Sequence, residues 1–475
     1  SMAITSSASH GIEIGRRALQ AQQASLNATG NNIANVNTPG FSRRQVRLEN
    51  AISSGQNGIG SGVDLEGVAR QRSRFIDAQM RVQQQVLGRW EVLESAIGTI
   101  EAVFNEPAGA GSSEAGTIFN EPSGLGLSGS FSRFWNAWQD LANVPESGAA
   151  RAVVRQEADF MVTTLHQYHD KLRDARNGMD ADVMDEVSDI NEMLDQLADI
   201  NSQVPRASFD GGDASDLKDR RDLIIDELSR RVDISLTESD NGQISVLLAG
   251  HNLLQGDHVV HLQVRQTVDD GTSVSQVHYA DDGTRARISE GRLRGLIEVR
   301  DNVVPKLLTN LDEMAAGLVT EINALHRTGF GKDGGTGVNF FDPGKIDASN
   351  IAVDNAILSN LNNIAASADG NTGDNGMALA LSSLRNGNIL SDGTQTMEGF
   401  YYEMLGEVGA LSGEAQTMAE NHRLFSSQIE NRRQSVQGVS LNDEASQLML
   451  FQRAYQAAAR TVSIIDELLE VTVNI

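Results

Sequence analysis

Three glycines match the fingerprint of a dinucleotide-binding loop, because Gly124, Gly126 and Gly129 are spaced as G-x-G-x-x-G. A functional loop of this kind follows a β-strand and opens the helix of a βαβ unit, where helix amides bind the pyrophosphate. Here a turn-forming sequence at 120–123 precedes the glycines, and an amphipathic aromatic segment follows them. The context therefore favours a helix start, and we expect no nucleotide or other cofactor.

Histidines and acids occur at spacings found in metal sites, but none of them completes a metal-binding motif. His166 and His169 are one helical turn apart, without the glutamate that a zinc hydrolase requires. Three further histidines have strand-like spacing, and eight acids lie opposite the apolar stripe of a predicted helix, as on a solvated face. These are His251, His258 and His261, and Asp180, Asp182, Asp185, Glu186, Asp189, Glu192, Asp195 and Asp199. We predict no catalytic residue and no metal ligand.

Composition excludes several other classes of function. The 475-residue chain contains no cysteine, so disulfides, thiolate catalysis and cysteine-ligated metals are excluded. Its net charge of −26 argues against a nucleic-acid binder, because phosphates require a basic surface. No apolar run is long enough to span a membrane. The N-terminus lacks a basic and apolar start, so we expect no cleavable secretory signal.

The charge is unevenly distributed along the chain. Residues 1–90 contain 10 basic and 5 acidic residues, a net charge of +5, so the remainder carries −31. One interpretation is a chance asymmetry among solvated faces. The other is that the basic N-terminal segment contacts an acidic partner, either the chain's own C-terminus or a neighbouring subunit.

Both ends of the chain show a seven-residue apolar repeat, which is typical of coiled-coil helices. The N-terminal repeat has one apolar residue per heptad, so its helix needs a partner to be stable. The obvious partner is the C-terminal helix, which has two apolar rows. The N-terminal row is Ile12, Leu19, Leu26 and Ile33; the C-terminal rows are Leu441, Leu448, Tyr455, Val462 and Leu469, and Phe451, Ala458, Ile465 and Thr472. We predict that the chain starts and ends in one bundle.

Between the ends, the apolar period is that of helices and then changes to that of strands. Residues 148–204 and 296–326 have apolar residues at three-four spacing, which predicts an antiparallel helical body. Alternating runs flank Asn241-Gly242, the strongest short signal for a β-hairpin. The Gly/Asn/Asp-rich stretch 330–400 predicts an irregular cover on the helical body.

The predicted fold class is therefore mainly α, in three parts. Residues 1–45 and 436–475 form a terminal coiled-coil domain. Residues 46–229 and 291–435 form an elongated helical body domain. Residues 230–290 form a small inserted β-rich domain.

A polar segment, residues 31–43, ends the first helix. Its asparagines can adopt left-handed backbone conformations and bond the last helical carbonyls, and proline keeps the preceding threonine extended. The simplest interpretation is a helix stop followed by a turn. The segment includes Asn31, Asn32, Ile33, Asn35, Asn37, Pro39 and Gly40.

This segment resembles the N-terminal motif of the axial proteins of the bacterial flagellum, which include the rod, hook and hook-associated proteins. Residues 441–444, 451–460 and 466–469 resemble the second signature of that family. Interior segments at 134–142, 217–222, 323–326 and 340–341 resemble the helical body of its hook-associated members. The resemblance therefore spans nearly the whole chain.

The resemblance implies a non-enzymatic structural subunit at the hook–filament junction, exported by the flagellar type III secretion system to the outside of the cell. It implies self-association in the axial structure, with the hook protein and a second hook-associated junction protein (FlgL-like) as neighbours. An export chaperone (FlgN-like) would cover the C-terminal helix. We choose Phe451 and Tyr455 as its anchors, because aromatic side chains concentrate binding energy at interfaces; the alternative is that these residues serve only the final coiled coil. Neither nucleic acid nor membrane insertion is expected.

Two alternatives remain open. A hook or rod protein of the same family would share the terminal motifs, but a hook protein would be mostly β between them. An enzyme carried on an axial scaffold would need a catalytic insertion, and the sequence shows no catalytic motif.

Overall fold

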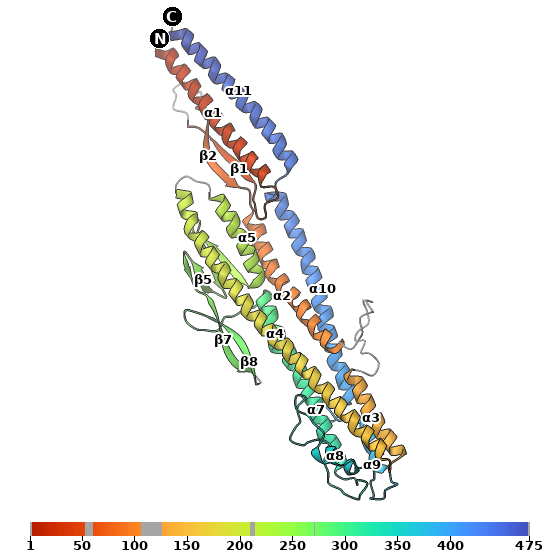
Figure 1. The fold of residues 1–475 in the computed structure, drawn as a ribbon. Coiled ribbons are helices and arrows are strands. Elements are labelled where there is room, and N and C mark those ends of the chain that lie inside the picture. Colours follow the sequence, from red (N-terminus) through yellow and green to blue (C-terminus); the bar gives the residue numbers. More distant parts are fainter. Residues whose placement is uncertain (1, 53–59, 106–125, 210–213, 270, 474–475) are drawn as a thin grey trace.

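The protein is a long, mainly helical molecule whose two ends lie side by side at one tip (Figure 1). The computed structural model describes residues 2–52, 60–105, 126–209, 214–269 and 271–473. The first helix, α1 (Met2–Ala34), packs along the last helix, α11 (Leu441–Val473). The predicted pairing of the chain ends is therefore present within one molecule. Among the described helices, none is both long and apolar enough to cross a membrane.

Two glycines allow α1 and α11 to approach closely. A Cβ atom on Gly15 would collide with Val462, and one on Gly11 would lie 3.0 Å from Ile465. A short antiparallel hairpin of β1 (Arg44–Asn50) and β2 (Val63–Arg70) packs against α1. We did not predict this hairpin, and we assigned most of it to the helical body. Because of its contacts with α1, we propose to count it with the terminal helices.

The helical body is built on long helices that bury a shared apolar core. Helix α2 (Arg74–Asn105) runs along α10 (Met397–Gln437), and α3 (Leu127–Asn143) packs on α4 (Gly148–Phe209). Helix α4 has 62 residues and is therefore roughly 93 Å long. Its predicted apolar stripe is buried, as is that of α7 (Val304–His326).

The predicted β domain is confirmed as an insertion between helices α5 (Ser215–Arg231) and α6 (Arg292–Glu298). Strands β3 (Ile234–Glu238), β4 (Ile244–Leu248), β5 (His251–Gln255) and β6 (His258–Val259) form one sheet in that order. Strands β7 (Leu262–Asp269) and β8 (Thr272–Tyr279) form a separate hairpin beside α4. The Asn241-Gly242 turn joins β3 to β4, and Gly242 has the positive φ of 81° that the turn requires.

A buried charge network attaches β8 to the body. The Arg300 guanidinium donates to the Asp180 carboxylate and to the Ser275 carbonyl, both at 2.7 Å, and Asp180 also accepts from the Ser275 amide. Arg300 lies in a π-helical turn, Val299–Val303, between α6 and α7. The prediction that all eight acids of α4 form a solvated face is therefore wrong for Asp180, and also for Glu186, which is buried beside Arg231 and Arg292.

The stretch between α7 and α10 is irregular, as predicted, and covers the far end of the body. It contains α8 (Asn355–Ser359), α9 (Gly376–Ser383) and 3-10 turns at Leu361–Asn363 and Leu384–Asn386. Beneath it lies an aromatic cluster in which Trp138 and Phe340 contact His326. The Nδ1 of His326 donates to the Val338 carbonyl at 2.7 Å, and its Nε2 accepts from the Ala365 amide at 2.9 Å.

Burial lowers the pKa of His326 from 6.5 to about 4, so the folded protein holds this ring neutral. The stabilisation from the neutral ring is complete above pH 6.5 and is lost as the pH falls toward 4, because the unfolded chain takes up the proton first. The full loss is on the order of 3 kcal/mol.

We therefore expect the difference in unfolding free energy between the wild type and His326→Gln to shrink between pH 6.5 and pH 4. Urea titrations at several pH values measure this difference. His258→Gln, at an exposed edge strand, is the matched control and should track the wild type. A difference that stays constant with pH would contradict the assignment of a neutral buried histidine.

Candidate functional site

The C-terminal end of α1 and the start of α11 meet around a buried carboxylate. Glu444 is 0 % exposed, and its Oε2 accepts a hydrogen bond from Nδ2 of Asn32 at 3.1 Å. Asn32 also pairs with the backbone of Arg44 in β1, donating to its carbonyl at 3.0 Å and accepting from its amide at 2.7 Å. One asparagine of the predicted motif therefore connects α1, α11 and the hairpin.

Arg43 supplies the positive charge that Glu444 needs. Its Nε donates to Oε1 of Glu444 at 2.5 Å, and its Nη1 donates to Gln71. Its backbone amide donates to the Gln437 carbonyl at 3.0 Å, and its carbonyl accepts from the Gln71 amide at 2.8 Å. The three places where the chain crosses between the terminal unit and the body, at 41–43, 71–73 and 438–440, therefore meet at Arg43. We call this region the joint.

An arginine–aspartate network continues the joint onto α5. Arg44 pairs with Asp216 and Asp219, and Arg70 pairs with Asp219 and Asp222, at 2.6–2.9 Å. These groups are mostly buried, where a paired charge is stable and an unpaired one costs several kcal/mol. The network therefore fixes the hairpin against the body.

Burial alone would raise the pKa of Asp222, but the neighbouring charge of Arg72, followed by those of Arg70 and Arg81, holds it below its ordinary value. The carboxylate therefore stays ionised at the centre of the network. The hypothesis that the basic N-terminal segment contacts acids of its own chain is consistent with these ion pairs. Its proposed C-terminal partner is represented by Glu444, whereas the acids of α5 were not anticipated.

The polar motif ends α1 partly as expected: an asparagine side chain bonds a last helical carbonyl, but none of its described asparagines has a left-handed backbone. Asn35 Nδ2 donates to the Asn31 carbonyl at 3.0 Å, and Thr38 Oγ1 donates to Asn35 Oδ1 at 3.1 Å. No asparagine of the described segment has positive φ; only Gly40 does, with φ of 77°, where it lies against Leu223 of α5. The motif therefore turns the chain from α1 onto the body.

The other predicted self-assembly residues lie along the α1–α11 pair. In α1, Ile12, Leu19, Leu26 and Ile33 are half-buried and Asn31 is exposed; Asn37 and Pro39, in the turn after the helix, are exposed as well. In α11, Leu448, Phe451, Ala458, Val462, Ile465 and Leu469 are half-buried, whereas Leu441 is 51 % and Tyr455 is 37 % exposed. The structure brings the two rows onto adjacent helices, with Val462 and Ile465 against the glycines of α1.

A second apolar stripe on α11 was missed by the sequence analysis. It stays exposed although α1 is packed beside the helix, and Leu450, Ile464 and Val471 share one heptad position, separated by fourteen and seven residues. That shared position is the sequence signal for this stripe, which lies outside the two predicted rows. The stripe comprises Met449 (56 % exposed), Leu450 (63 %), Ile464 (58 %), Leu468 (59 %) and Val471 (55 %). We call it the outer stripe.

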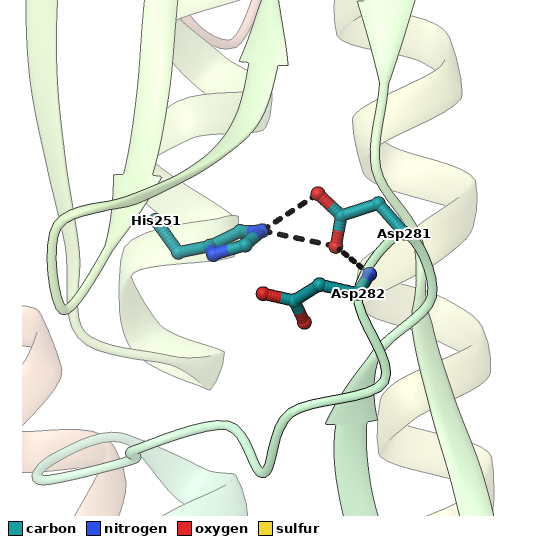
Figure 2. Close-up of side chains that lie close together, drawn as sticks. All are labelled: His251, Asp281 and Asp282. Atoms are coloured by element: carbon teal, nitrogen blue, oxygen red, sulfur yellow. Dashed lines mark hydrogen bonds and ion pairs between the residues drawn. The ribbon is translucent and has the colours of Figure 1, made fainter.

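One group of three potential metal ligands occurs among the described residues (Figure 2). His251 Nε2 contacts both oxygens of Asp281, at 3.0 and 3.1 Å, and its ring stacks on Tyr279. The neighbouring Asp282 caps its own turn by accepting from the amide and hydroxyl of Thr284, and these bonds lower its pKa. Each group has a protein partner, so the arrangement is explained as a link between β5 and the turn after β8.

The remaining residues considered for chemistry do not converge. His261 pairs with Asp195, whereas His166 bonds the Ile351 carbonyl and His169 contacts Asp170. Of the glycine triplet, Gly124 lies outside the described residues. Gly126 precedes α3 and Gly129 lies in its first turn.

Three protein-family models match the chain. The flagella basal body rod protein family matches residues 12–41, and the C-terminal family of the flagellar basal body rod FlgEFG proteins matches residues 433–475. The helical domain of the flagellar hook-associated protein FlgK matches residues 112–341. The two terminal matches meet at the joint, and the central one covers helices α3 to α7 of the body with the β insertion.

Relatives match along nearly their whole length. Flagellar hook-associated protein 1 of Bacillus subtilis is 32 % identical over 511 residues, which cover 98 % of this chain and 97 % of the relative. The Salmonella typhimurium protein of the same name is 26 % identical over 560 residues, covering 96 % and 98 %. The solved flagellar hook junction protein FlgK from Burkholderia pseudomallei has a similar fold, with a TM-score of 0.65 at 15 % identity, covering 75 % of this chain and 100 % of that one.

From the geometry of the joint we expect Asn32→Asp to destabilise it far more than Asn31→Asp, although the two substitutions are chemically identical. The first places a second carboxylate beside buried Glu444, whereas the second adds a charge to an exposed position. We expect Asn32→Asp to destabilise the joint by about 3 kcal/mol or more. Hydrogen exchange of the amides of residues 41–50 and limited proteolysis at the joint measure the loss, and equal protection in both variants would contradict it.

Proposed function

Because the chain belongs to the family of flagellar hook-associated protein 1, we propose that it is a structural subunit that forms the hook–filament junction. Family membership establishes a bacterial flagellar protein with an axial structural role, in a family of structural proteins rather than enzymes. The junction itself is the finer part of the proposal. It rests on the helical-domain match, which separates this chain from the rod proteins whose terminal motifs it shares.

The observation that carries the assembly role is the outer stripe of α11. Its five apolar side chains remain more than half exposed after α1 has packed against the helix. Burying each of them would contribute about 1 kcal/mol or more. An exposed apolar seam of this kind marks an interaction surface. We propose that the α1–α11 pair of a second copy covers it, so that the terminal helices of neighbouring subunits assemble as a coiled-coil bundle.

The other parts of the proposal follow from the family. The chain would leave the cell through the flagellar type III secretion system and become part of the extracellular flagellum. Its neighbours would be further copies of itself, the hook protein and a second hook-associated junction protein (FlgL-like). A FlgN-like export chaperone would bind the C-terminal helix before export.

The two apolar faces of α11 predict different defects. Leu448→Asp with Ile465→Asp places carboxylates on the half-buried face beside α1, so we expect loss of the α1–α11 pair and of assembly, with the body still folded. Leu450→Asp with Ile464→Asp changes only exposed positions, so we expect a normally stable monomer that fails to assemble.

Thermal unfolding of the purified variants and electron microscopy of cells that carry them separate these outcomes. The matched control is Gln452→Asp with Ser463→Asp, which changes polar exposed residues of the same helix. Hooks without filaments are expected for both apolar variants and complete flagella for the control. Normal filaments with the outer-stripe variant would refute the proposed assembly surface.

The chaperone proposal makes a separate prediction. Deleting residues 440–475 should abolish binding of the chaperone in calorimetry, because both faces of α11 are removed. Phe451→Ala with Tyr455→Ala should weaken binding by roughly 100-fold if these aromatics are the anchors. Met449→Ala with Leu468→Ala is the comparison on the outer stripe. Unchanged affinity after the deletion would place the recognition surface elsewhere.

A further inference from the structure

A wide cleft separates the hairpin from the helical body on one side of the joint. It has a volume of about 1270 Å³ and lies between β1–β2, the start of α2, α5 and strand β3. Basic side chains dominate its walls, in a chain whose net charge is −26. They are Arg47, Arg70, Arg72, Arg74, Arg81, Lys218 and Arg221, against the acids Glu66, Asp77, Asp222 and Glu238.

Part of this positive charge is not used inside the molecule. Arg47 and Lys218 make no ion pair within the described part of the chain. Arg74, whose side chain is 91 % exposed, and buried Arg221 both pair with the single carboxylate of Glu238, at 3.1 and 3.3 Å. By contrast, Arg70, Arg72 and Arg81 are occupied by the network of the joint. The cleft therefore contains cations without an ion pair beside arginines whose charge is already neutralised by the joint.

The walls of the cleft also include exposed apolar side chains. Leu65 of β2 is 47 % exposed and Val82 of α2 is 60 % exposed. Apolar groups surrounded by charged residues are typical of protein–protein contacts.

The same chain carries a complementary surface on α4. Between Arg176 and Arg206 this helix has no basic residue, and six exposed acids follow one face. Asp189 pairs with Arg231 and Asp195 pairs with His261, whereas the other four make no ion pair among the described residues. These six residues, which we call the acidic ridge, are Asp182, Asp185, Asp189, Glu192, Asp195 and Asp199.

A molecule cannot use its own ridge to fill its own cleft. Ser208, near the end of the same helix, lines the cleft, so the centre of the ridge lies roughly 27 Å away along α4. A second copy shifted by about this distance along the long axis would bring its ridge level with the cleft.

We propose that the basic cleft of one subunit receives the acidic ridge of a second copy of this chain. The contact places the cleft beside the joint of one subunit against α4 of the next, at a distance from the terminal helices. Opposite charges would orient the incoming subunit, while like charges elsewhere keep free monomers apart. This inference rests on the proposed assembly role and adds a second contact to it.

Cross-linking in assembled flagella tests the contact, and the absence of native cysteine gives a clean background. Lys218→Cys with Asp185→Cys, treated with a short bis-maleimide, should give dimers and higher ladders of this chain on denaturing gels. Lys218→Cys with Glu414→Cys, at an exposed position of α10, is the control and should stay monomeric. No ladder from the first pair, or a product of this chain with a different protein, would overturn the proposal.

Charge reversal tests it independently. Arg47→Glu with Lys218→Glu should lower the amount of chain in isolated hook structures by about tenfold, because like charges then face each other. Adding Asp185→Lys and Glu192→Lys to the same chain should restore incorporation, which a folding defect would not allow. Unchanged incorporation of the first variant, or no recovery in the second, overturns the cleft–ridge contact. Failure of the wild-type chain itself to enter these structures would instead refute the proposed function.

Discussion

The arrangement of the molecule depends on the buried carboxylate of Glu444. A charge with no exposed surface is stable only if opposite charge and hydrogen-bond donors surround it. Here the donors come from Asn32 and Arg43, more than 400 positions earlier in the chain. Both of these partners of Glu444 lie at the other end of the sequence. The first and last helices must therefore meet at this point. The direction of both helices, and of the hairpin bonded to Asn32, follows from that requirement.

Periodicity predicted those parts of the fold that are encoded locally. The seven-residue rows, the three-four spacing of α4 and α7, and the Asn-Gly turn between β3 and β4 each depend on neighbours a few positions apart. The hairpin β1–β2 lacked such a signal: its strands alternate weakly, and residues 51–62 separate them. A pattern also indicates which face is apolar but not which partner covers it, so the two stripes of α11 could not be ranked from sequence.

The candidate site was predictable only in part, for a physical reason. The asparagine motif and the LNDE sequence at 441–444 were recognised separately, but a hydrogen bond between residues 412 positions apart leaves no periodic trace. The ion pairs of the acids on α5 and of Asp180 are also long-range contacts that leave no periodic trace. An acid opposite an apolar stripe is solvated by default, and only the position of Arg300 in a neighbouring helix places Asp180 in the interior. A sequence pattern therefore predicts that such an acid is solvated, and a tertiary ion pair can bury it instead.

The meeting of three chain crossings at Arg43 also constrains the order of folding. Bringing α1 and α11 together in an unfolded chain means closing a loop of roughly 400 residues, which is slow and entropically unfavourable. Packing of α2 on α10 brings together Gln71, just before α2, and Gln437, at the end of α10, whose backbone groups both bond Arg43. A body that folds first therefore leaves a much shorter loop to close, and we expect the terminal helices to join last. A chain delivered with its N-terminus first therefore cannot complete its terminal unit until its final residues have arrived.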